Sequence, residues 1–161
     1  IRLENRWVRR TVLTACVILA VLGAGRFSAP DSTSVALDAT SHWQDFDLLG
    51  IARHVSEGET VFVDVTADWC LTCKANKSLV LDRDPVRTRL RDGTVIAMQA
   101  DWTRPDDSIA RFLERHERYG IPFNVVFGPG APSGISLPEI LTPQAVLEAL
   151  DTASVRSLAS E

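Results

Sequence analysis

The chain has 161 residues, of which 45% are hydrophobic, and its formal net charge is -4. A chain of this length can form one globular domain with a hydrophobic core and carry additional residues at an end. Four of the first ten residues are arginine, so the remainder is acidic. An acidic remainder offers no broad cationic face for phosphate groups, which excludes nucleic-acid binding from the expected functions.

An uncharged apolar run occupies residues 11–25, with arginines on both sides of it. At about 1.5 Å per residue the run is shorter than the ~30 Å hydrocarbon core, but a helix extended to Trp7 and Phe27 would cross it. Because arginine-rich flanks stay in the cytoplasm, we expect residues 1–27 to be a transmembrane helix with a cytoplasmic basic flank, and the chain after it to be exported. A cleavable signal peptide and a buried soluble helix are the alternatives.

Small polar residues dominate positions 28–41, which we interpret as a linker, and we expect a folded domain over 42–153 with a tail over 154–161. Periodicity and turn residues predict the elements of the domain. They are a helix over 47–55, a strand over 60–66, helices over 70–81 and 85–90, a strand over 94–100, a helix over 106–119, strands over 123–127 and 135–137, and a helix from Pro143 that Thr142 caps. This order predicts an α/β fold in which a parallel pair of strands is extended by a terminal hairpin.

Two of the three cysteines, Cys70 and Cys73, are three residues apart, whereas Cys16 lies in the apolar run. A helix that begins at Cys70 would place its sulfur beside free backbone N–H groups and the positive end of the helix dipole, which favours the thiolate. We therefore expect Cys70 to attack a disulfide of a partner protein. Cys73, one helical turn later, would displace that partner, and Lys74 adds a cation nearby.

Metal binding is the main alternative for such a cysteine pair. Structural zinc requires four thiolate or imidazole ligands, and the chain has no second paired motif to join its scattered His42, His54 and His116. Haem attachment would need histidine directly after Cys73, where Lys74 stands. We therefore expect no cofactor, and copper(I) binding by two soft thiolates stays open as an alternative.

The segment VFVDVTADWCLTCK at positions 61–74 resembles the active-site strand and helix of thioredoxin-fold proteins. It is most similar to the carboxy-terminal periplasmic domain of DsbD-type transmembrane disulfide reductases. The similarity extends through ADWT at 100–103, YGIPF at 119–123 and LPEILT at 137–142. It implies a thioredoxin-like fold, with a central mixed sheet flanked by helices, preceded by one apolar membrane helix.

The resemblance also implies roles for individual residues. The Ile121–Pro122 bond would be cis and would face the cysteine pair, with an ordinary trans proline as the alternative. Asp64 would be a buried acid under the pair, with a pKa raised by desolvation, that exchanges the proton of Cys73. A solvent-facing aspartate is the alternative there.

Three further positions come from the same resemblance. Asp68 and Trp69 would lie at the rim of the site, where Trp69 could equally be a core aromatic residue. DsbD-type domains often carry an acid seven positions after the first cysteine, whereas this chain has Lys77. We expect the cation to favour the thiolate.

The function implied is that of a protein-disulfide reductase domain in the periplasm, attached to the inner membrane. An upstream membrane electron-transfer domain would reduce Cys70 and Cys73, and the pair would pass electrons to periplasmic disulfide-containing proteins, such as a disulfide isomerase or a cytochrome c maturation factor. A free-standing, membrane-anchored thioredoxin-like protein for cytochrome c maturation and a copper(I)-binding module are the alternatives.

Overall fold

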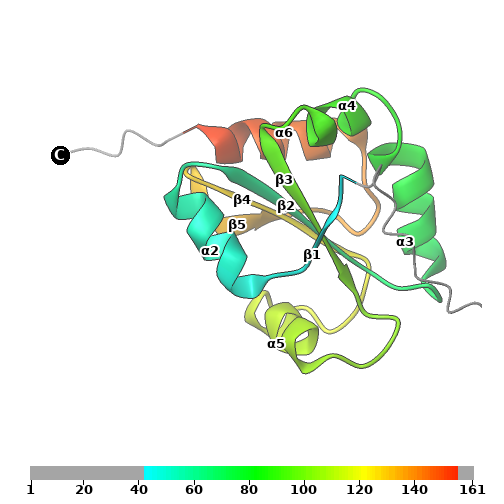
Figure 1. Cartoon of the computed structure of the whole chain (residues 1–161). Helices are drawn as coiled ribbons and strands as arrows, with labels where there is room; N and C mark the ends of the chain where they lie inside the picture. The colour runs from blue at the N-terminus through cyan, green and yellow to red at the C-terminus, as the bar shows by residue number, and fades with distance from the viewer. Residues whose placement is uncertain (1–41, 156–161) are drawn as a thin grey trace, which may run out of the picture. The chain divides into compact units, whose positions relative to one another are not determined.

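The computed structural model describes residues 42–155, which form one mixed sheet flanked by helices (Figure 1). The strands are β1 (Gln44–Asp45), β2 (Thr60–Thr66), β3 (Val95–Asp101), β4 (Phe123–Gly128) and β5 (Ala131–Ser136). The helices are α2 (Leu48–Ser56), α3 (Leu71–Asn76) with its π-helical continuation η2 (Lys77–Leu81), α4 (Val86–Arg91), α5 (Asp107–Arg115) and α6 (Pro143–Ser154).

The predicted membrane helix over 1–27 and the predicted linker over 28–41 lie outside the described residues, as does most of the predicted tail. Within residues 42–155, every helix is too short or too polar to cross a bilayer. The membrane anchor and the domain boundaries therefore stay predictions.

The sheet has the strand order β1-β3-β2-β4-β5, with β2 at its centre. β2 pairs in parallel with β3 and antiparallel with β4, and β4 pairs antiparallel with β5. This arrangement confirms the predicted parallel pair and terminal hairpin. The two-residue β1, which pairs in parallel with β3, was not predicted because two residues carry no detectable periodicity.

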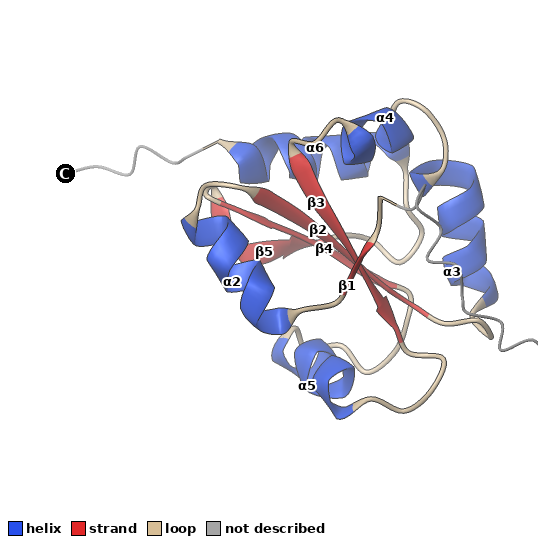
Figure 2. Cartoon of the chain, in the orientation of Figure 1, coloured by secondary structure: helices blue, strands red, loops and turns tan. Residues whose placement is uncertain are grey.

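Side chains of β2 alternate between two cores on opposite faces of the sheet. Val61, Val63 and Val65 pack with residues of α2 and α5, whereas Phe62 packs with residues of η2, α4 and α6. Figure 2 shows these two groups of helices on opposite sides of the strands. Because both faces are covered, β2 needs apolar side chains at nearly every position, which explains its β-branched and aromatic sequence, interrupted only by Asp64.

The predicted helix over 106–119 is too long, because α5 ends at Arg115. Arg118 N–H donates to the carbonyl oxygen of Leu113 at 2.9 Å, and Glu117 N–H donates to that of Glu114 at 3.0 Å. These two bonds with a left-handed Glu117, at φ 56°, close the helix as a Schellman motif. A glycine usually occupies this left-handed position, so the end of the helix could not be predicted from a sequence that has glutamate there.

We predict that Gly128→Ala destabilises the domain by about 2–3 kcal/mol, because a Cβ there would clash with the carbonyl oxygen of Ala153 in α6. Chemical denaturation measures this change in the free energy of unfolding. Gly120→Ala is the matched control, since a Cβ at Gly120 meets no heavy atom within 4 Å. Equal losses in the two variants would contradict the close approach of β4 to α6.

Candidate active site

Cys70 occupies the start of the helix that follows the central strand. β2 ends at Thr66, and the chain turns so that Cys70 N–H donates to the carbonyl oxygen of Ala67 at 3.0 Å. Cys70 is the N-cap of α3, with extended backbone angles of φ -86° and ψ 101°. Its Sγ accepts a hydrogen bond from the backbone N–H of Cys73 at 3.1 Å. This donor and the helix dipole would stabilise negative charge on Sγ, in agreement with the predicted helix tip.

Cys70 and Cys73 form a disulfide, with their Cα atoms 5.3 Å apart. The Cα separation lies inside the usual range for bonded cysteines, so one helical turn brings the two sulfurs together without displacing the backbone. Cys70 is 6% exposed and Cys73 is 3% exposed. Both cysteines are therefore largely covered, whereas the two chain neighbours of Cys70, Trp69 and Leu71, are 61% and 81% exposed.

The loop before β4 lies against the cysteine pair. The Ile121–Pro122 peptide bond is cis, and Ile121 packs against the small cluster of Ala67, Cys70 and Cys73. Pro122 is buried and leads directly into β4. The structure therefore confirms the cis bond and places Ile121 against the pair, and the role of Pro122 stays a prediction.

Three polar side chains form a row across β3, β2 and β4. Asp64 is opposite Gln99 of β3 and opposite Asn124 of β4, so the three side chains project from the same face of the sheet. We call Gln99, Asp64 and Asn124 the polar row. Asn124 Nδ2 donates to Asp64 Oδ1 at 2.8 Å, and both residues are buried. This is the face on which Phe62 contacts η2, α4 and α6.

The burial of Asp64 decides its acid–base chemistry. Desolvation raises the pKa of Asp64 from 3.8 to about 6, while the hydrogen bond from Asn124 and the charge of Lys77 act in the opposite direction. A carboxyl group with this pKa exists in both protonation states near neutral pH, so it can accept or give a proton. The structure therefore excludes a solvent-facing Asp64.

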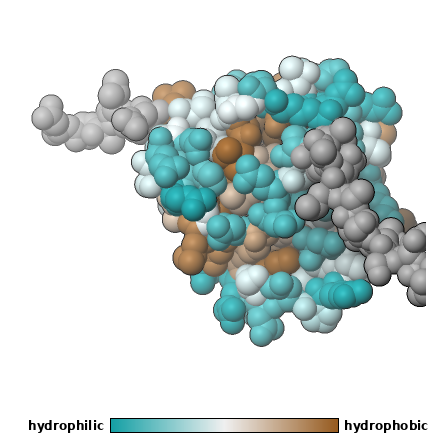
Figure 3. All heavy atoms as spheres, in the orientation of Figure 1, coloured by the Kyte–Doolittle hydropathy of each residue, from teal (hydrophilic) through white to brown (hydrophobic). Residues whose placement is uncertain are grey.

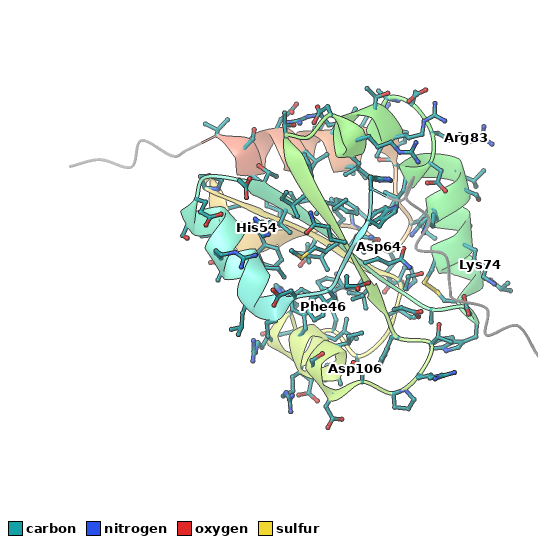
Figure 4. The ribbon with its side chains drawn as sticks, in the orientation of Figure 1. Phe46, His54, Asp64, Lys74, Arg83 and Asp106 are labelled. Atoms are coloured by element: carbon teal, nitrogen blue, oxygen red, sulfur yellow. A yellow bond between two sulfur atoms is a disulfide. The ribbon has the colours of Figure 1, made fainter. Side chains whose placement is uncertain are left out.

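Asp68, Trp69 and Lys74 are the remaining residues predicted to support the site. Asp68 is exposed, and its backbone N–H donates to Thr103 Oγ1 at 2.9 Å. Trp69 lines a hollow of about 290 Å³ together with Trp102, Thr103 and Pro105. Lys74 is exposed, and Figure 4 shows its side chain directed outward from α3. Their roles in the reaction stay predictions.

Lys77 contacts the polar row. Its Nζ donates to Gln99 Oε1 at 2.8 Å and lies 5.4 Å from the ring centroid of Trp43. The cation is thus bound to the polar row, and its charge lowers the pKa of Asp64. The structure thus shows an effect of this cation on the buried acid, and its predicted effect on the Cys70 thiolate stays a prediction.

Sequence reasoning missed two residues that organise the site. Asn124 lies in β4, which the sequence predicts from its apolar residues. A polar side chain within a buried strand is unusual, and this alone could have marked Asn124 as a candidate site residue. Asn76 of α3 donates from Nδ2 to the carbonyl oxygen of Glu139 at 2.7 Å and accepts from Leu141 N–H at 3.1 Å. It thereby fixes the loop after β5 against the active-site helix.

Two other features of the described residues lie apart from the cysteines. His54, Glu57 and Glu59 bring possible metal-ligand atoms within 4.8 Å of one another at the end of α2, on the other side of the view from Lys74 (Figure 4). A hollow of about 730 Å³ lies between α2 and α5, with Ile51 and Phe112 in its lining. Apolar side chains show at the surface of this region in Figure 3. Neither cysteine belongs to either feature.

A family model described as thioredoxin-like matches residues 43–129. The thiol:disulfide interchange protein DsbD of Cronobacter sakazakii is 32% identical over 111 residues, which cover 67% of this chain and 19% of that protein. DsbD of Ralstonia nicotianae is 27% identical over 110 residues, which cover 68% of this chain and 18% of that protein. The chain thus spans about a fifth of the length of the curated relatives that it matches.

Solved structures show the same fold. The reduced carboxy-terminal domain of DsbD from Neisseria meningitidis matches with a TM-score of 0.53 at 19% identity, covering 68% of this chain and 99% of that chain. A thioredoxin from Thermus thermophilus matches with a TM-score of 0.55 at 19% identity, covering 74% of this chain and 92% of that chain. At these identities the likeness concerns the arrangement of helices and strands.

We predict that Asp64→Asn raises the free energy of unfolding of the oxidised protein at pH 8. Because folding raises the pKa of Asp64 from 3.8 to about 6, ionisation penalises the folded state as pH rises through this window. The gain should be about 3 kcal/mol at pH 8 and should vanish near pH 3, as measured by denaturant titration at both pH values. Asp68→Asn, at an exposed position, is the control; a pH-independent gain in Asp64→Asn would contradict the raised pKa.

Proposed function

The chain belongs to the thioredoxin-like family, and we propose that it is a thiol:disulfide oxidoreductase domain of the DsbD type, which reduces protein disulfides through a reversible Cys70–Cys73 disulfide. The observation that carries this proposal is the bonded pair at the start of α3, with Cys70 Sγ accepting a backbone hydrogen bond. The similarity to thiol:disulfide interchange proteins of two bacteria supports thiol–disulfide exchange, and the reductive direction is part of the proposal.

The reaction begins with the reduced pair. The thiolate of Cys70 attacks one sulfur of a partner disulfide, so the partner S–S bond breaks and a mixed disulfide forms on Cys70. The partner's second sulfur leaves as a thiolate and takes up a proton. Cys70 suits this step because its sulfur lies at the helix N-terminus, next to the backbone N–H of Cys73.

The second step releases the partner. Asp64, as a carboxylate, takes the proton of the Cys73 thiol, and the Cys73 thiolate attacks the Cys70 sulfur of the mixed disulfide. The bond to the partner breaks, and the partner's remaining sulfur leaves and is protonated. Two electrons and two protons have then passed to the partner, and the Cys70–Cys73 disulfide of the structure is restored.

Partner binding would use the exposed surface next to the cysteine pair. Ile121 packs against the pair just before its cis peptide bond to Pro122, and the exposed Trp69 and Leu71 flank Cys70 in the chain. An extended segment of the partner could lie along this loop, where its backbone and its apolar side chains would meet matching groups. No cofactor enters this scheme, because the cysteines carry the electrons themselves.

The source of electrons in the proposal is an upstream membrane electron-transfer domain. Residues 1–27 would anchor the chain in the inner membrane and place residues 42–153 in the periplasm, where disulfide-containing proteins are the acceptors. This context is supported by the similarity to DsbD proteins, of which the chain spans about a fifth.

We predict that Cys73→Ala accumulates mixed disulfides on Cys70 when the reduced variant meets periplasmic proteins, because the group that releases the partner is gone. Non-reducing electrophoresis and mass spectrometry of the captured species measure this. Cys70→Ala is the matched control and should capture almost nothing, and both variants should lose catalytic insulin reduction. Equal capture by the two variants would contradict the assigned order of attack.

A further inference from the structure

Lys77 is held in place on the covered face of the sheet by two groups. Its Nζ donates to Gln99 Oε1 at 2.8 Å, and the ring centroid of Trp43 lies 5.4 Å from the same nitrogen. Gln99 is opposite Asp64 in the parallel register of β3 and β2. The side chain that anchors the ammonium group is therefore the strand neighbour of the buried carboxyl group.

The polar row thus has a neutral hydrogen-bond donor at one end and a cation at the other. Asn124 donates a hydrogen bond to Asp64 from the β4 side, and the cation of Lys77 lies on the β3 side through Gln99. The hydrogen bond from Asn124 and the charge of Lys77 both favour the ionised form of Asp64. Burial alone would favour the neutral form. The contact with Gln99 is charge-assisted, so it fixes the position of the cation while leaving its charge unneutralised.

We propose that Lys77 is a positioning residue that keeps Asp64 ionised at neutral pH, so that Asp64 can accept the proton of Cys73 when the mixed disulfide is resolved. The inference rests on the proposed function, because it concerns the second of the two exchange steps. Lys77 itself touches neither sulfur in this scheme. It acts through the carboxyl group, and its effect is electrostatic.

The charges that face Asp64 in the described residues have opposite signs. Lys77 of η2 lowers the pKa of Asp64, Asp82 after η2 raises it, and the neutral Asn124 of β4 lowers it through its hydrogen bond. On the α3 side, Cys70 and Cys73 become titratable when the disulfide is reduced. Removal of Lys77 and removal of Asp82 should therefore move the protonation of Asp64 in opposite directions.

The test separates the two exchange steps in one experiment. The fully reduced protein is mixed with 5,5′-dithiobis(2-nitrobenzoate) in a stopped-flow instrument, and release of thionitrobenzoate is followed over time. The first release reports attack by Cys70 on the reagent, and the second reports attack by Cys73 on the mixed disulfide. The ratio of the two rates thus isolates the step in which Asp64 takes part.

We expect Lys77→Met to slow the second release about threefold at pH 6.5 and to change it little at pH 9, because loss of a nearby opposite charge raises the pKa of Asp64 by about one unit. The first release should be unchanged. Lys77→Arg should retain the wild-type profile, and Lys74→Met, which removes an exposed lysine of α3, is the matched control. Asp82→Asn should shift the pH dependence of the second release to lower pH.

Three outcomes of this experiment would contradict the role of Lys77. Identical pH profiles of the second release in wild type and Lys77→Met would overturn the inference, as would equal slowing of both releases at every pH, which is the mark of general structural damage. Shifts of the same sign in Lys77→Met and Asp82→Asn would also overturn it. If the proposed function itself were wrong, wild type would instead fail to reduce protein disulfides such as those of insulin, whatever its behaviour towards the small reagent.

Discussion

The burial of a carboxyl group in the central strand is the constraint on which the rest of the site depends. Asp64 is 3% exposed, and its neighbours in the strand at positions 61–63 and 65 are buried apolar residues. Such a group opposes folding when it is ionised, and nearby polar groups reduce but do not cancel this cost. The neighbouring strands supply those groups, since Gln99 and Asn124 are the register partners of Asp64.

This arrangement trades stability for chemistry. A hydrophobic residue at position 64 would complete the core on the face of Phe62, whereas the aspartate keeps a proton acceptor in the central strand that leads to Cys70. Natural proteins break local rules of this kind at functional sites. In the proposed mechanism, the sulfur at the helix tip is the reactive group, and the acid in the sheet accepts the proton of Cys73.

Local patterns in the sequence were sufficient for much of the fold. The strand over 60–66 has the predicted bounds, since a β-branched run between turn residues has few other solutions, and the Thr142–Pro143 start of α6 follows from capping preferences alone. The left-handed Glu117 was not predictable in this way, because the residue type that usually marks such a turn is absent.

The surroundings of Lys77 and Asp64 depend on contacts between distant segments, which the sequence alone does not predict. Lys77 was expected to act on the cysteines because it follows Cys70 by seven residues. Seven residues at about 1.5 Å each place it roughly 10 Å further along the helix axis, where Gln99 binds it. The pairing of Asp64 with Gln99 and Asn124 likewise depends on strand register, which single strands do not encode.

The central claim is that the buried carboxyl group serves the cysteine pair. The most direct test is a carbon-13 NMR titration of the Asp64 carboxyl group in the oxidised and in the dithiothreitol-reduced protein. We predict a midpoint near pH 6 in the oxidised protein, from the raised pKa, and a higher midpoint after reduction, because a thiolate nearby disfavours a second negative charge. A midpoint near 3.8 that is the same in both states would contradict the account.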